Sequence, residues 1–283
     1  MGNTFPREII LYVSKKIAAV YSENETNSLA SLLVEKVFKL TATQLMLNEQ
    51  LEIAKENSVC LEQSIERLLK NEPIQHIFGE AEFYGRKFKV NGDVLIPRQE
   101  TEELIQLIVD DNELEVPKIL DIGTGSGCIA CSLALEVKSA QVQAIDISEE
   151  ALITAQRNAD LLNAKVSFLK IDILKDSIPL KEFDIIVSNP PYVLDSERAL
   201  MHKNVVDYDP GLALFVPDND PLLFYKAIGD ISRQLLRSGG KLYFEINEKF
   251  GVAVAQSLNE LGYNQIKIHQ DLNGKDRFVI GII

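Results

Sequence analysis

The 283-residue chain has few residues that could bind a metal or form disulfides: three cysteines and three histidines. A sparse, odd set of thiols is typical of reduced cysteines in a cytoplasmic protein. Cys128 and Cys131 form a single CxxC, and a zinc site would need two further ligands, which the scattered histidines do not supply. Ordinary packing of both thiols is the simpler interpretation, with a redox pair as the alternative. We therefore expect no metal.

Long apolar runs are also missing. No segment approaches the ~20 apolar residues of a membrane span. Residues 1–8 are polar, and no apolar stretch typical of a secretory signal follows them. We therefore expect a cytoplasmic protein with no membrane partner.

Positive charge is the third shortage. The chain has 29 lysine and arginine residues against 42 aspartate and glutamate residues, which gives a formal net charge of -13. Proteins that coat nucleic acid are usually basic, because phosphate neutralisation drives their affinity. This charge argues against direct nucleic-acid binding and favours a small molecule or a protein as the partner. Hydrophobic residues make up 46% of the chain, enough for a sizeable core.

Hydrophobic periodicity divides the chain into three parts. Residues 1–72 read as a small helical bundle, because leucine and valine recur every three or four positions in segments such as 28–40. Residues 73–98 contain glycines separated by alternating aromatic and aliphatic residues, which predicts a β-hairpin linker. Residues 99–283 make up the third part, and their first segment, 99–111, reads as an amphipathic helix.

The third part alternates apolar runs with helical patterns. Later helices are expected at 222–238 and 250–262, and strands at 118–122, 141–146, 165–172, 183–189, 240–246, 264–271 and 276–283. Continuous valine and isoleucine runs between helices indicate a parallel arrangement covered on both faces. The sequence thus predicts an α/β fold, with a Rossmann-like mixed sheet and helices on both faces.

A glycine-rich loop, DIGTGSG at 121–127, follows the first strand and opens a helix. Glycines let a ligand approach the backbone, and the helix N-terminus offers free N–H groups. Cys128 stands where a dinucleotide-binding loop has its third glycine. A carboxylate at the loop entrance repels a pyrophosphate but accepts hydrogen bonds from an amino group. We expect the following residues to hold a ligand with an ammonium group: Asp121, Gly123, Thr124, Gly125 and Gly127.

Two further acids end strands. Asp146 lies 23 positions after Gly123, near the ~20-residue spacing at which a carboxylate binds ribose hydroxyls. Ile147 joins Asp146 among the cofactor-binding candidates, and Asp172, at the end of the next strand, is expected to face an adenine. An ammonium, a ribose and an adenine without phosphate together indicate S-adenosylmethionine. Helix capping is the alternative role for both acids.

The segment VSNPPYV, residues 187–193, leaves a buried strand through two prolines, which end a strand abruptly. The Asn189 side-chain oxygen and the Pro190 carbonyl could each accept a hydrogen bond from a planar NH2 group, and proline fixes that geometry. Asn189 would also face the methyl group of the cofactor, and Tyr192 would supply an apolar wall. We therefore expect methyl transfer to a planar nitrogen, with Asn189, Pro190 and Tyr192 as catalytic residues. A simple strand-ending turn is the alternative.

Together, DIGTGSG, VSNPPYV and IPRQETEEL at 96–104 resemble the HemK/PrmC family of release factor glutamine methyltransferases. The resemblance extends over nearly the whole chain, to the closing DLNGKDRFVIG. It implies a class I methyltransferase that moves a methyl group from S-adenosylmethionine to the glutamine amide nitrogen in the Gly-Gly-Gln loop of a peptide chain release factor. It also implies that the helical bundle grips this protein partner. The substrate-binding residues that it implies are Arg98, Asn189, Pro190, Pro191 and Tyr192, with Thr101 near the cofactor.

Three positions depart from the family pattern. Gln99 replaces a second proline, Asp209 with Pro210 replaces a Glu-Pro pair, and residues 246–247 stand where glycine is usual. None touches the expected chemistry.

The segment after the Asn-Pro-Pro-Tyr loop is expected to lie over the site. Residues 204–215 read as a lid with Gly211 as its hinge, and His202 and Lys203 are candidates for substrate contact.

Three other functions compete with this interpretation. An adenine-specific nucleic-acid methyltransferase would use the same Asn-Pro-Pro-Tyr chemistry on a flipped base, but it predicts a basic surface. A nicotinamide-dependent oxidoreductase is disfavoured by Asp121 and by the missing third glycine. A module that binds the cofactor without catalysis would keep its function when Asn189 is replaced.

Overall fold

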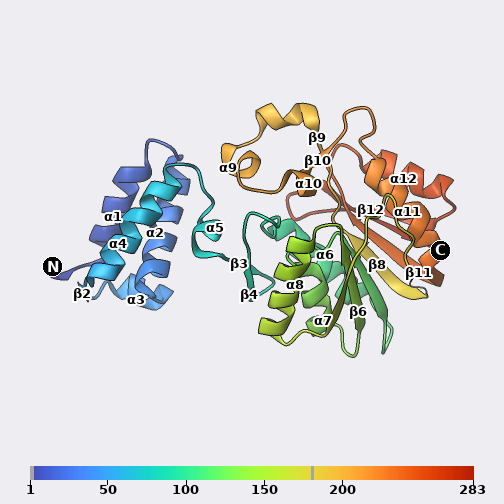
Figure 1. Cartoon of the computed structure of the whole chain (residues 1–283), viewed down its shortest axis with the longest axis horizontal. Helices are drawn as coiled ribbons and strands as arrows, with labels where there is room; N and C mark the ends of the chain where they lie inside the picture. The colour runs from blue at the N-terminus through green and yellow to red at the C-terminus, as the bar shows by residue number, and fades with distance from the viewer. Residues whose placement is uncertain (1–2, 180–181) are drawn as a thin grey trace. The chain divides into compact units, whose positions relative to one another are not determined.

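The structure is a computed structural model that describes residues 3–179 and 182–283. It divides into two compact units, Met1–Gly79 and Glu80–Ile283, and Figure 1 labels most of their elements. The boundary falls inside the segment predicted as a linker, residues 73–98, so the structure distributes that segment between the two units.

The first unit is helical, as the leucine periodicity predicted. Its helices are α1 (Pro6–Ile17), α2 (Glu23–Phe38), α3 (Ala42–Leu47), α4 (Lys55–Leu68) and α5 (Ile74–Phe78), and a short strand β1 (Asn3–Thr4) pairs antiparallel with β2 (Leu51–Glu52). Val13, Leu33 and Leu68 are fully buried where α1, α2 and α4 meet. Ser22 accepts a hydrogen bond from the Glu25 amide and so caps α2.

Helix α5 was not predicted, because residues 74–78 were assigned to the hairpin linker. Ile74 is 4% exposed and joins the core of the first unit. The Arg67 guanidinium donates to the carbonyl oxygen of Ile77 at 3.0 Å and is paired with Glu72. Gly79 ends the helix with a left-handed conformation, φ +65°. A helix of five residues is too short to show a helical period in the sequence.

A hairpin, as predicted, follows in the second unit. Strands β3 (Glu80–Phe83) and β4 (Arg86–Lys89) pair antiparallel, and Tyr84 and Gly85 make the turn with positive φ. Phe83 and Phe88 pack edge to face, with ring centroids 5.9 Å apart, in the core beneath α6 (Gln99–Asp111). The hairpin therefore contributes to the core of the second unit.

Within residues 3–179 and 182–283, the largest sheet has seven strands in the order β12-β13-β11-β8-β5-β6-β7. The strands are β5 (Lys118–Ile122), β6 (Gln141–Asp146), β7 (Val166–Lys170), β8 (Phe183–Ser188), β11 (Leu236–Glu245), β12 (Asn264–Gln270) and β13 (Asp276–Ile282). Strands β11, β8, β5, β6 and β7 run parallel, and β13 is antiparallel to both β11 and β12. The mixed sheet is as predicted.

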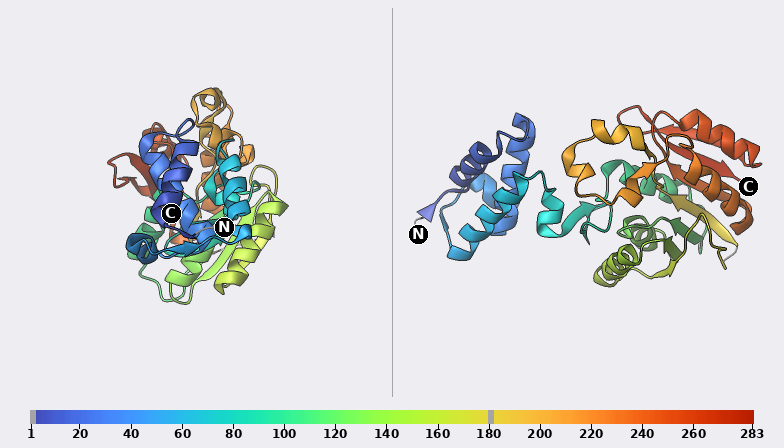
Figure 2. Two further views of the ribbon diagram at one scale, coloured as in Figure 1. Left: turned by 90° about the vertical axis from the view of Figure 1, so that its left-hand side faces the viewer. Right: turned by 45° about the horizontal axis from the view of Figure 1, so that its top comes forward.

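Helices cover both faces of this sheet, as Figure 2 shows from two sides. Ile119 packs on one face with residues of α6, α7 (Cys128–Glu136) and α8 (Glu149–Leu162), while its neighbour Leu120 packs on the other with residues of α11 (Leu223–Leu235) and α12 (Gly251–Glu260). Successive strand residues point to opposite faces, so the continuous apolar runs follow from burial on both sides.

The predicted lid, residues 204–215, belongs to a longer segment of short elements, residues 193–216. Strand β9 (Val193–Leu194) pairs in parallel with β10 (Phe215–Val216), and between them lie the 3-10 helix η1 (Asp195–Leu200), α9 (Lys203–Val206) and α10 (Gly211–Leu214). The Arg198 guanidinium lies over the Phe215 ring, 4.1 Å from its centroid. These contacts tie both ends of the segment together.

Candidate active site

The site lies where parallel strands end side by side. In the register of β5 and β8, Ile122 is opposite Ser188, so the glycine loop and the Asn-Pro-Pro-Tyr loop leave the sheet from paired positions. The Ser188 hydroxyl donates to the Ile122 carbonyl at 2.7 Å and ties the two strand ends together. Ligands of open α/β sheets bind at this carboxyl edge.

The glycine loop has the conformation that only glycine adopts easily. Gly123 and Gly125 have φ of +75° and +54°, and an added Cβ at either would meet no heavy atom within 4 Å. The amides of Gly123 and Thr124 both donate to the Ile145 carbonyl, at 2.9 and 3.1 Å. Hydrogen bonds to β6 thus fix one side of the loop, while the space beside Gly123 and Gly125 is open, which suits close approach of a ligand.

Gly127 has a different reason to be glycine. Its φ is +78°, and an added Cβ would stand 3.0 Å from the Ala155 Cβ on α8. This glycine therefore allows α8 to pack closely against the start of α7, which is a packing role.

Asp121 is a fully buried acid at the loop entrance. Its Oδ2 accepts a hydrogen bond from the Thr124 hydroxyl at 2.6 Å, and its Oδ1 has no hydrogen-bond partner in the described part of the chain. Burial, aided by the charge of Asp146, raises the pKa of Asp121 to about 7. A buried carboxylate with an unsatisfied oxygen favours a donor or a cation beside it.

Asp146, at the end of β6, contacts the glycine loop directly. Its Oδ2 accepts from the Gly125 amide at 2.8 Å, and its Oδ1 accepts from the Ser148 amide at 2.9 Å. Burial raises its pKa, against the lowering effect of these amides. The adjacent Ile147 side chain is 45% exposed. An exposed apolar residue beside the loop offers a surface for a flat ring.

Asp172 bonds within its own turn. It accepts from the Leu174 amide at 3.0 Å and pairs with Lys175 at 2.8 Å, and this hydrogen-bonded lysine lowers its pKa. These contacts stabilise a turn, whereas the alternative considered from the sequence was a helix cap. The role of Asp172 toward an adenine stays a prediction.

The Asn-Pro-Pro-Tyr loop begins with a half-buried Asn189 and a buried Pro190. The Asn189 side-chain amide donates to the Thr101 hydroxyl at 3.4 Å. The Asn247 side chain donates to the Tyr192 carbonyl at 3.4 Å. The loop is therefore held from α6 and from the residues after β11.

Glu245, at the end of β11, was not singled out from the sequence. It is 1% exposed, and burial raises its pKa to about 7. Thr101 donates to its Oε2 at 2.7 Å, and the Tyr192 hydroxyl donates to its Oε1 at 3.4 Å. An acid at the end of the buried strand KLYFE resembles Asp146 at the end of its own strand, and that was the available signal.

Arg98 pairs with Asp209, whose departure from the family pattern was noted from the sequence. The ion pair measures 2.8 Å, and the Asp209 side chain is 1% exposed while that of Arg98 is 39% exposed. The pair fixes the predicted lid to the start of α6. His202 and Lys203, at the start of α9, are exposed.

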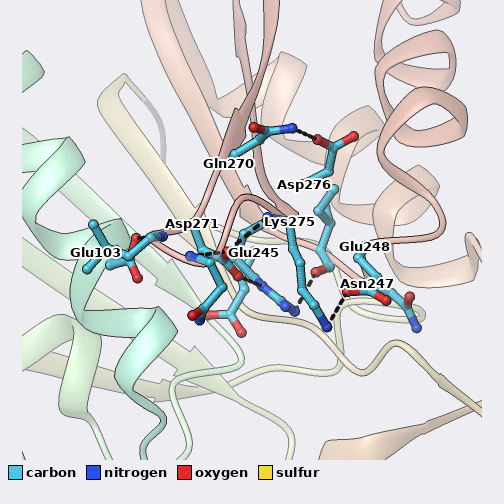
Figure 3. A network of polar contacts seen from close by, with 12 residues as sticks. Glu103, Glu245, Asn247, Glu248, Gln270, Asp271, Lys275 and Asp276 are labelled. Atoms are coloured by element: carbon cyan, nitrogen blue, oxygen red, sulfur yellow. Dashed lines mark hydrogen bonds and ion pairs between the residues drawn. The ribbon is translucent and has the colours of Figure 1, made fainter.

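Polar contacts also hold the turn between β12 and β13 near Glu245 (Figure 3). Asp271 accepts from the Arg277 guanidinium at 3.1 Å, and Arg277 in turn donates to the Ile246 carbonyl at 3.5 Å. The Leu272 amide donates to Glu103 of α6 at 3.0 Å. The closing segment DLNGKDRFVIG therefore supports the strand that carries Glu245.

Among residues 3–179 and 182–283, no group of three or more His, Cys, Asp or Glu residues could hold a metal ion. Within the same ranges no helix is both long and apolar enough to cross a membrane.

Comparison with known proteins first defines the class. The family model "Methyltransferase small domain" matches residues 100–207, and "PrmC N-terminal domain" matches residues 8–79. A methyltransferase from Pyrococcus furiosus has a TM-score of 0.53 at 19% identity, covering 78% of this chain and 98% of that one. The hMettl16 catalytic domain has a TM-score of 0.55 at 14% identity, covering 84% and 85%. The fold is that of a class I S-adenosylmethionine-dependent methyltransferase, as predicted.

Two curated relatives then give the family. A release factor glutamine methyltransferase of Bacteroides thetaiotaomicron is 44% identical over 272 residues, covering 96% of this chain and 98% of that protein. The one of Flavobacterium psychrophilum is 42% identical over 267 residues, covering 93% and 94%. The chain therefore belongs to the release factor glutamine methyltransferase family, as the HemK/PrmC resemblance predicted.

Proposed function

We propose that this protein transfers a methyl group from S-adenosylmethionine to the side-chain amide nitrogen of the glutamine in the Gly-Gly-Gln motif of peptide chain release factors. Besides family membership, one observation carries the proposal: the glycine loop and Asn189 leave the sheet from the paired positions Ile122 and Ser188. A cofactor held by the first loop and an amide held by the second would meet at one edge.

The residues of the glycine loop fit the proposed cofactor. Gly123 and Gly125 leave open space in front of the backbone, and the unsatisfied Oδ1 of Asp121 suits an ammonium group. Asp146 would bind the ribose hydroxyls with the remaining lone pairs of its carboxylate, and Ile147 and Asp172 would flank the adenine. When bound, S-adenosylmethionine would supply an electrophilic methyl group on a sulfonium sulfur and would leave as S-adenosylhomocysteine once the sulfur–methyl bond is broken. The methylated amide nitrogen would then release one proton to solvent.

The Asn-Pro-Pro-Tyr loop would hold the substrate. The Asn189 side-chain oxygen and the Pro190 carbonyl accept the two hydrogens of a glutamine NH2 group and so fix its plane. These acceptors also stabilise the positive charge that develops on the nitrogen during transfer, so they bind the transition state more strongly than the ground state. Pro191 stiffens the loop and Tyr192 forms an apolar wall.

The remaining parts would recognise the protein partner. We assign Arg98 to holding the lid segment through Asp209, at the border of the substrate position. The first unit, Met1–Gly79, would bind the body of the release factor. A translation factor as substrate makes the cytoplasm the proposed place of action.

The proposal is tested by incubating the protein with labelled S-adenosylmethionine and purified release factors. Label should enter wild-type factors but not factors whose Gly-Gly-Gln glutamine is changed to alanine. Label in an unmethylated DNA duplex, with none in the factors, would instead support the adenine methyltransferase.

Asn189→Ala separates catalysis from binding. We expect kcat to fall about 100-fold or more, because an acceptor used in the transition state is lost. The dissociation constant for S-adenosylmethionine, measured by calorimetry, should change by less than about threefold, since uniform binding is retained. Equal kcat in both proteins would contradict the proposed role of Asn189.

A further inference from the structure

A chain of hydrogen bonds reaches Asn189 from β11, the strand that pairs directly with β8. Glu245 on β11 accepts from the Thr101 hydroxyl at 2.7 Å, and the Thr101 oxygen accepts from the Asn189 side-chain amide at 3.4 Å. Thr101 and Glu245 are 2% and 1% exposed, so water does not compete for these partners. The same carboxylate accepts from the Tyr192 hydroxyl at 3.4 Å.

The direction of these bonds follows from chemistry. An ionised carboxylate only accepts, so the single proton of the Thr101 hydroxyl must point to Glu245. The Thr101 oxygen then presents a lone pair to Asn189, which must turn its NH2 end toward it. The Asn189 carbonyl oxygen is left to face away from Thr101. A carboxamide has nearly the same shape in both orientations, so its neighbours alone decide which end is the acceptor.

We propose that Glu245 is a positioning residue that fixes the polarity of the Asn189 carboxamide through the Thr101 hydroxyl. The inference rests on the proposed function, in which Asn189 must offer an oxygen, and not an NH2 group, to the substrate amide. If Thr101 lost its fixed direction, it could donate to the Asn189 oxygen, and the substrate would then meet a donor.

Burial disfavours the charged form of Glu245, and its surroundings offset only part of that cost. It interacts electrostatically with Glu100 on α6, Cys128 on α7, Tyr192 in the loop, Tyr225 on α11 and Arg277 on β13. Arg277 is the cation of this set and is held in place by Asp271. Burying a carboxylate is unfavourable unless hydrogen bonds and a cation offset it. A neutral side chain would be easier to bury, but it would not act as an acceptor only.

The test uses Thr101→Val, which removes the hydroxyl while keeping the shape, and Thr101→Ser, which keeps the hydroxyl. At about pH 8, where Glu245 is ionised, Thr101→Val should lower kcat for release factor methylation about 10- to 100-fold. KM for the release factor and the affinity for S-adenosylmethionine should change by less than about threefold, because the lost acceptor acts in the transition state. Thr101→Ser should restore kcat to within about threefold of wild type.

A matched control separates this effect from general damage. Thr154→Val removes another buried threonine hydroxyl, on α8, and should leave kcat within about twofold of wild type. A double-mutant cycle then tests whether Thr101 acts on catalysis through Asn189. If it does, Thr101→Val should have almost no further effect on kcat in an Asn189→Ala background. Equal losses of kcat in both backgrounds, or wild-type kcat in Thr101→Val, would overturn the inference.

A second readout does not need activity. In the wild type, nuclear Overhauser contacts should join the Asn189 side-chain amide protons to Thr101, and Thr101→Val should weaken them as the carboxamide turns over. If the wild type fails to methylate release factors but shows these contacts, the proposed function is wrong and the polarity assignment stands. If it methylates them and lacks the contacts, the polarity assignment is wrong.

Discussion

Replacing Gly127 by alanine tests whether glycine is needed there for close packing against α8, and not for the approach of a ligand. Gly127 has φ +78°, which costs a residue with a side chain about 1–2 kcal/mol. Its new Cβ would also stand 3.0 Å from the Ala155 Cβ and 3.2 Å from the Ala155 Cα. Because both atoms belong to a packed helix, overpacking adds about 1–3 kcal/mol. We therefore expect Gly127→Ala to lower the free energy of unfolding by about 2–5 kcal/mol.

Gly125→Ala and Gly85→Ala provide matched controls. Both glycines have positive φ, +54° and +69°, and both have open space where the Cβ would stand. Each change should therefore cost only about 1–2 kcal/mol. Gly125→Ala should also weaken S-adenosylmethionine binding about tenfold or more, because the Cβ enters the space proposed for the cofactor. Gly85→Ala, in the hairpin turn, should leave that affinity unchanged.

The assays are urea unfolding followed by circular dichroism and calorimetric titration with S-adenosylmethionine. We expect a crossed result: stability falls most in Gly127→Ala, and affinity for S-adenosylmethionine falls most in Gly125→Ala. Equal stability losses in the three variants would refute the packing role of Gly127. Wild-type affinity in Gly125→Ala would refute the idea that the ligand lies against the loop.

Two further predictions concern the buried acids. Arg98→Ala leaves Asp209 buried without this cation. Amide hydrogen exchange in residues 203–216 should therefore speed up about tenfold or more, and KM for the release factor should rise. Unchanged exchange would contradict the anchoring of the lid by this ion pair. Folding raises the pKa of Glu245 from 4.5 to about 7, so the protonated carboxyl contributes to the stability of the folded state. This contribution to stability is fully present below pH 4.5 and is lost as the pH rises through about 7. The Gln side chain of Glu245→Gln cannot titrate, so the free energy of unfolding in urea of this variant should rise relative to that of the wild type between pH 5 and about pH 8. A difference between the two proteins that stays constant over this range would count against the raised pKa.

The predictions from the sequence were most accurate where burial alone sets the pattern. Strand β5 and helix α6 have the residue ranges that were predicted, 118–122 and 99–111, because a two-sided apolar run and an amphipathic stripe are local signals. Strand β11 begins at Leu236, earlier than predicted, through an irregular register with β8 around residues 236–241. Such irregularities depend on the neighbouring strand and leave no period in the sequence.

The two loops of the site could be predicted from the sequence, but the contacts that distant residues make with them could not. The glycine loop and Asn-Pro-Pro-Tyr are contiguous motifs, so their chemistry can be read from neighbouring letters. Glu245 becomes part of the site through Thr101, which is 144 positions away in the chain, and through Tyr192. The partner of Arg98 lies 111 positions away. Pairings at such separations are set by the order of strands in the sheet, which a single sequence does not specify.

The buried Asp121 has a consequence for the thermodynamics of ligand binding. Its pKa of about 7 means that near neutral pH the carboxyl exists as a mixture of acid and anion. A cation that arrives beside it favours the anion, so association should expel a fraction of a proton into the buffer. The heat measured for that association would then depend on which buffer takes up the proton, even though no residue has moved.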